Sequence, residues 1–165
     1  MPDYLLVANP VARSGKNAAR ISRVQRLLHK VGAAGELFET RPGGATITAL
    51  ATHLSQKSDY QAVLAMGGDG TFREVGSALF RSGLADRLPL GMLPTGTAND
   101  QGRSFGLSAA DSALKDNVHI VLQGHETRLD LGRLRAFNEA QEIACAEFFD
   151  SFGLGLSARV LLSSR

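Results

Sequence analysis

Apolar and polar residues alternate with two different periods along the first three quarters of the chain. Continuous apolar runs, typical of buried parallel strands, predict strands over residues 4–8 and 62–66, and residues 36–40 and 88–93 are interpreted as two further strands. Apolar residues three and four positions apart predict helices around residues 21–31, 47–54 and 72–79. The sequence Ser108-Ala109-Ala110-Asp111 resembles a capping box and predicts a further helix from there to about Leu122. This alternation predicts an α/β fold, with a parallel sheet between helices.

The pattern changes after Gly124. Leu129 and Leu131 alternate with polar residues, residues 135–141 form a polar connection, and residues 143–149 form another strand-like run. Consecutive strands without a helix between them predict antiparallel pairing. We therefore expect a Rossmann-like lobe with helices on both faces of its sheet over residues 1–124, followed over residues 125–165 by the first strands of an incomplete, mainly β lobe.

Composition and charge exclude several classes of protein. Hydrophobic residues make up 44% and charged residues 21%, as in ordinary globular domains, and a net charge of +2 does not indicate nucleic-acid binding. Cys145 is the only cysteine, and the sequence has neither a signal-like N-terminus nor an apolar run of the roughly 20 residues that span a bilayer. These features predict a cytoplasmic protein. A group of basic residues near the front is interpreted as contacts to phosphates or an anionic membrane: Arg13, Lys16, Arg20, Arg23 and Arg26. The alternative for Arg20, Arg23 and Arg26 is a solvated helix face.

Three glycine-containing loops directly follow predicted strands. They occupy residues 9–16, residues 67–71 (Gly-Gly-Asp-Gly-Thr) and residues 94–100 (Pro-Thr-Gly-Thr-Ala-Asn-Asp). Ligands of open parallel sheets bind outside the carboxyl ends of the strands, and glycine lets backbone N–H groups approach an anion closely. A following helix stabilises each nearby negative charge by ~0.3–1 kcal/mol. The three loops therefore predict a polyphosphate site.

Asp69 is the residue of these loops best suited to chemistry. A carboxylate among glycines at a strand end can orient Mg²⁺, which usually binds one or two carboxylates together with phosphate oxygens. The alternative is a turn residue that hydrogen-bonds its own backbone. Glu74 either buttresses the loop or is an exposed helix carboxylate. Asn99 and Asp100 either hold a ribose, Mg²⁺ or an acceptor hydroxyl, or cap a helix.

Two motifs match known fingerprints only in part. The first loop departs from the P-loop pattern, because Pro10 replaces a glycine and Asn17 replaces Ser or Thr, although Ser14-Gly15-Lys16 still offers N–H groups and a cation. Residues 153–158 fit the dinucleotide fingerprint, but no strand with an acidic end follows them, so we interpret them as a tight passage from strand to helix. The histidines share no metal-ligand spacing with one another or with Cys145.

The three loops, in this order, resemble the diacylglycerol kinase catalytic domain that sphingosine kinases and bacterial lipid kinases share. The resemblance extends to Asp130-Leu131-Gly132 and to residues 149–158. Gly-Gly-Asp-Gly-Thr alone also occurs in NAD kinases. The residues that carry the resemblance are Asn9-Pro10, Ser14-Gly15-Lys16, Thr40, Gly67 to Thr71 with Glu74-Val75, Pro94, Gly96-Thr97, Asn99-Asp100 and Arg103.

This resemblance implies an enzyme that uses ATP and Mg²⁺ to transfer a γ-phosphoryl group to the hydroxyl of a lipid such as diacylglycerol. Asp69 would organise the metal or the phosphates, with Lys16 or Arg13 as charge partners. The expected nucleotide contacts are Asn9, Arg13, Ser14, Gly15, Lys16, Thr40, Gly67, Gly68, Asp69, Gly70, Thr71, Glu74, Gly96, Thr97, Asn99 and Asp100.

The sequence also departs from the family pattern. Arg73, Ser77 and Gln101-Gly102 replace residues common in the family, and Gly43-Gly44-Ala45 lacks a frequent histidine. Family members are longer, and the resemblance places their general base and part of their metal site in an Asp-Gly-Glu region of the second lobe. We therefore expect the 165-residue chain to bind nucleotide weakly and to turn over little.

Two other functions remain open at this point, an NAD kinase-like phosphotransferase and a non-catalytic module that binds nucleotide or phospholipid. The expected partners are ATP, a lipid alcohol and, transiently, the membrane surface. An exposed apolar face would favour a homodimer, and its residues are Phe148, Phe149, Phe152 and Leu154.

Overall fold

A computed structural model of the chain describes residues 4–12, 15–96 and 99–150 and divides the chain into two compact units, Met1–Thr127 and Arg128–Arg165. The first unit contains β1 (Tyr4–Ala8), α1 (Lys16–Lys30), β2 (Gly35–Glu39), the short 3-10 helix η1 (Pro42–Gly44), α2 (Ala45–Gln56), β3 (Ala62–Gly67), α3 (Asp69–Arg81), β4 (Leu90–Pro94), α4 (Asp100–Ser104) and α5 (Leu114–Leu122). The second contains β5 (Gly132–Asn138) and β6 (Gln141–Phe148).

The four strands of the first unit form a parallel sheet with the order β2-β1-β3-β4. The chain moves from β1 outward to β2, then returns past β1 to β3 and continues to β4. The direction of the connections therefore reverses between β1 and β3. In doubly wound sheets this switch point, at the carboxyl ends of the strands, is where ligands bind.

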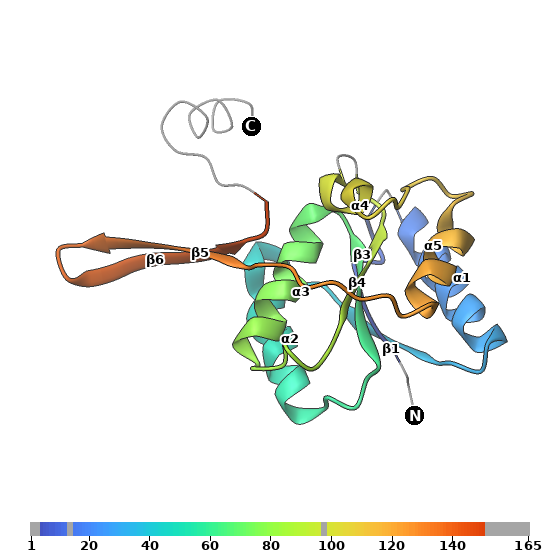
Figure 1. The fold of residues 1–165 in the computed structure, drawn as a ribbon, viewed down its shortest axis with the longest axis horizontal. Coiled ribbons are helices and arrows are strands. Elements are labelled where there is room, and N and C mark those ends of the chain that lie inside the picture. The colour runs from blue at the N-terminus through green and yellow to red at the C-terminus, as the bar shows by residue number, and fades with distance from the viewer. Residues whose placement is uncertain (1–3, 13–14, 97–98, 151–165) are drawn as a thin grey trace. The chain divides into compact units, whose positions relative to one another are not determined.

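Helices cover both faces of this sheet (Figure 1). Side chains alternate along each strand, so that Leu6 and Leu64 belong to a core with α1 and α5, whereas Leu5 and Val7 are buried on the opposite side. On the α1 side, Val24 and Leu28 are fully buried at helical spacing. The predicted α/β fold with helices on both faces is therefore confirmed.

The predicted capping box at Ser108 is wrong, because α5 begins only at Leu114. Ser108 Oγ accepts a hydrogen bond from the N–H of Ala110 (3.3 Å). The main chain of Ser108 is held by Asn117, whose Nδ2 donates to the Ser108 carbonyl (2.7 Å). Asp111, which would have completed the box, forms an ion pair with Arg20 of α1 instead.

The interpretation of Arg20 as part of a solvated helix face is also wrong. Its side chain is 7% exposed, and its Nη1 donates to the carboxylate of Asp111 and to the carbonyl of Ala109 (3.2 Å). Arg23 and Arg26 are exposed as expected. The arginine at the start of this predicted helix face therefore fastens the segment before α5 to α1.

The second unit is an antiparallel hairpin, as its strand pattern predicts, with a register from Gly132 opposite Phe148 to Asn138 opposite Gln141. The predicted polar connection over residues 135–141 is wrong in extent, because β5 continues to Asn138 and leaves Glu139 and Ala140 as the turn. Arg135 Nε donates to Glu142 across the hairpin (2.6 Å). Such cross-strand ion pairing lets a polar segment form a strand.

Apolar side chains are exposed on this hairpin, namely Leu134, Phe137 and Ile143. Of the predicted apolar face, Phe148 and Phe149 are partly buried, and Phe152 and Leu154 lie outside the described residues. None of the described helices has the length and apolar character needed to cross a membrane.

Candidate functional site

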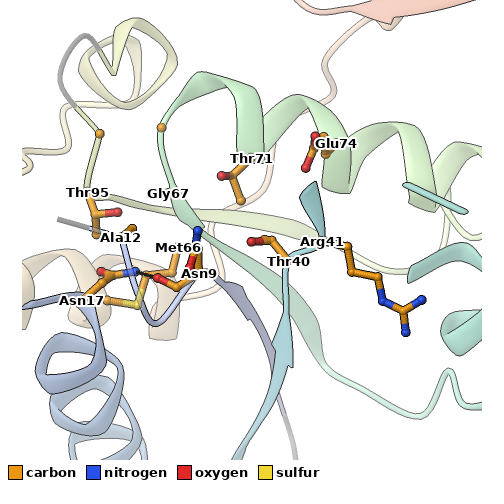
Figure 2. A pocket seen from close by; sticks show the side chains of 12 residues that line it. Asn9, Ala12, Asn17, Thr40, Arg41, Met66, Gly67, Thr71, Glu74 and Thr95 are labelled. Atoms are coloured by element: carbon orange, nitrogen blue, oxygen red, sulfur yellow. Dashed lines mark hydrogen bonds between the residues drawn. The ribbon is translucent and has the colours of Figure 1, made fainter. Parts of the chain in front are cut away.

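A cavity of about 480 Å³ opens at the carboxyl edge of the sheet, around the switch point between β1 and β3 (Figure 2). Its described lining comes from the first loop, from the ends of β2, β3 and β4, from the first turn of α1 and from the first two turns of α3. The lining residues are Asn9, Ala12, Asn17, Thr40, Arg41, Met66, Gly67, Gly68, Thr71, Glu74, Thr95 and Gly96. Seven of these belong to the predicted site: Asn9, Thr40, Gly67, Gly68, Thr71, Glu74 and Gly96.

The loop after β3 presents backbone donors at the start of α3. Gly68 is the extended N-cap, and the N–H of Phe72 donates back to its carbonyl (3.1 Å). The N–H groups of Asp69, Gly70 and Thr71 precede this first helical bond and have no carbonyl within the helix. With the helix dipole, they form a local environment suited to phosphate oxygens.

Close contacts require glycine at position 67 of this loop and at position 96 of the third loop. The side chain of Thr71 lies against the α-carbon of Gly67, so a β-carbon there would clash with it. A β-carbon on Gly96 would lie 2.7 Å from the α-carbon of Gly68. The N–H of Thr95 donates to the Gly67 carbonyl (2.8 Å), so the second and third loops lie backbone to backbone.

Asp69 is half-buried and is not among the described residues that line the cavity. Its Oδ1 accepts a hydrogen bond from the N–H of Gln101, the second residue of α4 (3.1 Å). A carboxylate that accepts from the second N–H of a helix acts as an N-cap. Asp69 therefore joins the glycine loop to α4, and its other carboxylate oxygen is the one left for a ligand.

Asn99 closes the third loop on itself. It is 5% exposed and adopts a left-handed backbone conformation (φ 52°). Its Oδ1 accepts from the N–H of Gly96 (2.9 Å), while its Nδ2 donates to the Gly96 carbonyl (2.5 Å). The exposed Asp100 lies next to Arg103 (3.4 Å), and neither Asn99 nor Asp100 is among the described lining residues.

The first loop begins as a turn stabilised by Asn9. Its Oδ1 accepts from the N–H of Val11 (3.0 Å), and its carbonyl accepts from Ala12 N (3.3 Å) and from Asn17 Nδ2 (2.7 Å). Gly15, with φ 84°, and Lys16 are exposed at the start of α1 and are not among the described lining residues. Arg13, Ser14 and Thr97 lie outside the described residues.

The other side of the cavity is formed by the end of β2 and by α3. The N–H of Thr40 donates to the carbonyl of Ala8 (2.9 Å), which continues the sheet pairing by one residue. Arg41 is held through its backbone, because Thr46 Oγ1 accepts its N–H (2.9 Å) and donates to its carbonyl (3.0 Å). Figure 2 shows the Arg41 side chain extending away from Asn9, whereas Thr40 and Thr71 lie closer to the strand ends.

Sequence reasoning missed five residues of the lining: Ala12, Asn17, Arg41, Met66 and Thr95. Thr95 and Arg41 are adjacent to the predicted residues Gly96 and Thr40. Their positions just after the predicted strands could have indicated them. In the sequence, Asn17 differs from the P-loop pattern and has no other feature that indicates a site residue. Its burial to 1% exposure depends on its packing under the first loop, which no local pattern reveals.

A polar cluster fastens β2 to α2 outside the cavity. Glu36 Oε2 accepts from Lys57 Nζ (2.5 Å) and from the Tyr60 hydroxyl (3.0 Å), and His53 Nε2 lies 2.9 Å from that hydroxyl. The hydrogen bond from Lys57 lowers the pKa of Glu36, and burial together with Glu36 raises the pKa of Tyr60 to about 12. The cluster fixes the strand whose end carries Thr40.

No group of three or more His, Cys, Asp or Glu side chains that could hold a metal ion occurs within the described residues. The described part of the chain therefore contains no cage of the kind that binds calcium or zinc. Mg²⁺ can be held differently, mainly by phosphate oxygens and its own water molecules, with one or two protein oxygens. The carboxylate of Asp69, that of the cavity-lining Glu74 and the other oxygens at the cavity fit that second arrangement.

A sequence profile described as the diacylglycerol kinase catalytic domain matches residues 3–134, which include all the loops around the cavity. The chain belongs to this family. A diacylglycerol kinase of Staphylococcus saprophyticus is 29% identical over 131 residues, which are 79% of this chain and 41% of that protein. A diacylglycerol kinase of Staphylococcus haemolyticus is 35% identical over 94 residues, which are 57% of this chain and 26% of that protein.

A solved structure shares the fold of this chain. A crystal structure of a diacylglycerol kinase from Bacillus anthracis strain Sterne superposes with a TM-score of 0.61 at 22% identity, covering 79% of this chain and 43% of that one. At this identity the likeness concerns the fold. The chain spans about two fifths of the length of the S. saprophyticus kinase, the first of these relatives.

Proposed function

We propose that this chain forms the nucleotide-binding part of an ATP- and Mg²⁺-dependent lipid kinase. In the proposed reaction, the hydroxyl oxygen of a lipid such as diacylglycerol attacks the γ-phosphorus of ATP while a general base takes the hydroxyl proton, and the bond to the β–γ bridging oxygen breaks to release ADP. Catalysis of this kind depends mainly on positioning and on neutralising the phosphoryl oxygens. Membership of the diacylglycerol kinase catalytic domain family supports a lipid kinase.

The observation that carries the proposal is the loop between β3 and α3. It places three backbone N–H groups, those of Asp69, Gly70 and Thr71, at the start of a 13-residue helix beside the cavity. Gly67 and Gly68 line that cavity without side chains, so a phosphate can approach the backbone closely. A cavity of about 480 Å³ is within the usual range for small-molecule sites.

Within this proposal the expected contacts divide into those to the phosphates and those to the rest of the nucleotide. The glycine loop and Asn9 would bind the phosphates, with Lys16, Arg13 and Ser14 as further contacts, while Thr40, Glu74, Gly96 and Thr97 would contact the rest of the nucleotide. Asp69 would organise the metal or the phosphates through the carboxylate oxygen that Gln101 does not occupy. Mg²⁺, when bound with ATP, would offset the charge of the phosphoryl oxygens.

We further propose that the lipid pocket and the general base belong to the part of such kinases that this chain does not match. The 165-residue chain is then expected to bind nucleotide weakly and to transfer little phosphate. Transient contact with a membrane surface would deliver the lipid. A homodimer would form through the apolar face around Phe148, Phe149, Phe152 and Leu154.

Two measurements test this function. Calorimetric titration of the chain with ATP in the presence of Mg²⁺ should show saturable binding, and its absence would contradict the nucleotide site. A phosphorylation assay of a longer protein containing this chain should then offer diacylglycerol, sphingosine and NAD side by side. Phosphate transfer to NAD alone would favour the NAD kinase alternative, and binding without any transfer would favour a non-catalytic module.

A further inference from the structure

Asn17 has an unusual position for a polar side chain. It is the second residue of α1, it lines the cavity, and it is only 1% exposed. Its Nδ2 donates to the Asn9 carbonyl (2.7 Å). Its Oδ1 has almost no exposed surface, and no group of the described residues donates a hydrogen bond to it. A buried acceptor without a partner destabilises a folded protein, so a species that pairs with it binds favourably.

The chemistry of Asn9 fixes the orientation of this amide. A backbone carbonyl can only accept a hydrogen bond, so the amide nitrogen of Asn17 must face it. Exchanging the two amide atoms would place two acceptors 2.7 Å apart. The oxygen therefore stays on the side of the amide that points away from Asn9, as Figure 2 shows.

An amide oxygen selects its partner by charge and by size. It does not pair with ionised phosphate oxygens, because these are acceptors too. A nucleobase or a ribose is too bulky for an oxygen with so little exposed surface. A water molecule is also too large, because almost none of this oxygen's surface is accessible to water. A bare divalent cation is smaller than water, and amide oxygens are ordinary ligands of hard divalent cations.

The position of Asn17 in the sequence leads to the same partner. Gly15-Lys16-Asn17 stands where the P-loop pattern has Gly-Lys followed by Ser or Thr, whose hydroxyl binds Mg²⁺. Asn17 also supplies an oxygen at that place, at the start of a 15-residue helix and beside the proposed phosphate site. The buried oxygen and its position are independent observations.

We propose that Asn17 Oδ1 directly binds the divalent cation that accompanies the nucleotide. This inference rests on the proposed function, because it requires a bound nucleotide. It assigns two tasks to one side chain: the amide nitrogen holds the turn at Asn9, and the amide oxygen contributes to metal binding.

The first test compares two buried asparagines in the 165-residue chain. Asn117 of α5 is 2% exposed, and both parts of its amide interact with Ser108, so Asn117→Leu is the matched control for Asn17→Leu. Calorimetry measures ATP affinity with Mg²⁺ and with EDTA. We expect Asn17→Leu to reduce the gain in affinity from Mg²⁺ by at least about 10-fold, the lower end of losses seen when a metal site loses a supporting partner. The gain compares the affinities of one variant with Mg²⁺ and with EDTA, so an effect of losing the hydrogen bond to Asn9 enters both measurements. Asn117→Leu should keep the full gain.

The second test needs no substitution and applies even if Asn17→Leu does not fold. In the ¹⁵N-labelled wild-type chain, ATP with Mn²⁺ should broaden the side-chain amide signals of Asn17 much more than those of Asn117. ATP with Mg²⁺ should broaden neither. Equal broadening of the two asparagines by Mn²⁺ would overturn the inference.

The outcomes separate the two proposals. If ATP does not bind with Mg²⁺ or with EDTA, the proposed function and the inference both fail. If ATP binds and Asn17→Leu retains the wild-type gain from Mg²⁺, the inference fails while the proposed function stands.

Discussion

Gly68 and Gly96 lie back to back, so closely that a β-carbon on Gly96 would be 2.7 Å from the α-carbon of Gly68. The two residues follow different strands and are far apart in the sequence. Their contact brings the loop after β3 against the loop after β4. Two of the three predicted glycine loops are thereby joined into one wall of the cavity.

The first prediction concerns this contact. Gly96→Ala should lower the free energy of unfolding by about 1–3 kcal/mol, because the new methyl group meets backbone that cannot move aside. Urea denaturation measures the effect. Gly70→Ala is the matched control, since Gly70 lies in the same site with open space around its α-carbon. It should be as stable as wild type or up to about 1 kcal/mol more stable, as expected for alanine in a helix. Equal stability of the two variants would contradict the proposed close contact.

The second prediction separates the charge of Asp69 from its hydrogen bond to Gln101. Asp69→Asn retains an oxygen that can accept from the Gln101 N–H, so its stability should remain near that of wild type. Asp69→Ala removes the acceptor and should cost about 1 kcal/mol in unfolding free energy. Both variants should lose about tenfold in affinity for ATP with Mg²⁺, or roughly 1.4 kcal/mol. An unchanged calorimetric affinity of Asp69→Asn would rule out a role for its charge.

The third prediction concerns the ion pair between Arg20 and Asp111. Asp111→Ala leaves the buried guanidinium of Arg20 without this carboxylate and should reduce the unfolding free energy by about 1–2 kcal/mol. The loss stays below that of a fully buried pair, because the Asp111 side chain is 75% exposed. Arg23→Ala, which removes an exposed donor to the Asp111 carbonyl, should cost less than about 0.5 kcal/mol. Thermal denaturation of both variants tests the difference, and a larger loss from Arg23→Ala would contradict it.

The fourth prediction follows from the lowered pKa of Glu36. A carboxyl group that ionises more readily in the folded state stabilises the protein above its ordinary pKa of 4.5, and this contribution disappears as the pH falls through the folded-state pKa. Glu36→Gln should therefore be less stable than wild type at pH 7, and the difference should shrink below pH 4.5. Urea midpoints across this pH range test it. Glu39→Gln, an exposed change on the same strand, controls for net charge, and a pH-independent effect of Glu36→Gln would refute the prediction.

Local patterns were sufficient for much of the fold. The run Tyr4 to Ala8 predicts β1 without error, and the spacing of Val24 and Leu28 predicts the buried face of α1, because both depend on the period of side chains along a single element. The glycine loops were recognisable because their glycine and polar residues are close together in the sequence and directly follow predicted strands. Strand–helix alternation then places them at one edge of the sheet.

Long-range contacts account for the errors. Ser108 and Asp111 have the spacing of a capping box, yet Asp111 pairs with Arg20, 91 residues earlier, and the helix starts later. The sequence around Arg135 is polar and locally disfavours a strand. Its pairing with Glu142 across the hairpin offsets this preference. In each case a partner distant in the sequence outweighs the local preference.

The sequence by itself determined the α/β order of elements, the family motifs and the identity of the loops that surround the cavity. Only the tertiary structure decided how those loops are used. It buries Asn17 against Asn9, uses Asp69 to cap α4 and engages both sides of the Asn99 amide with Gly96. The physical reason is that periodicity depends on neighbours along the chain, whereas burial and hydrogen-bond partners depend on packing between elements.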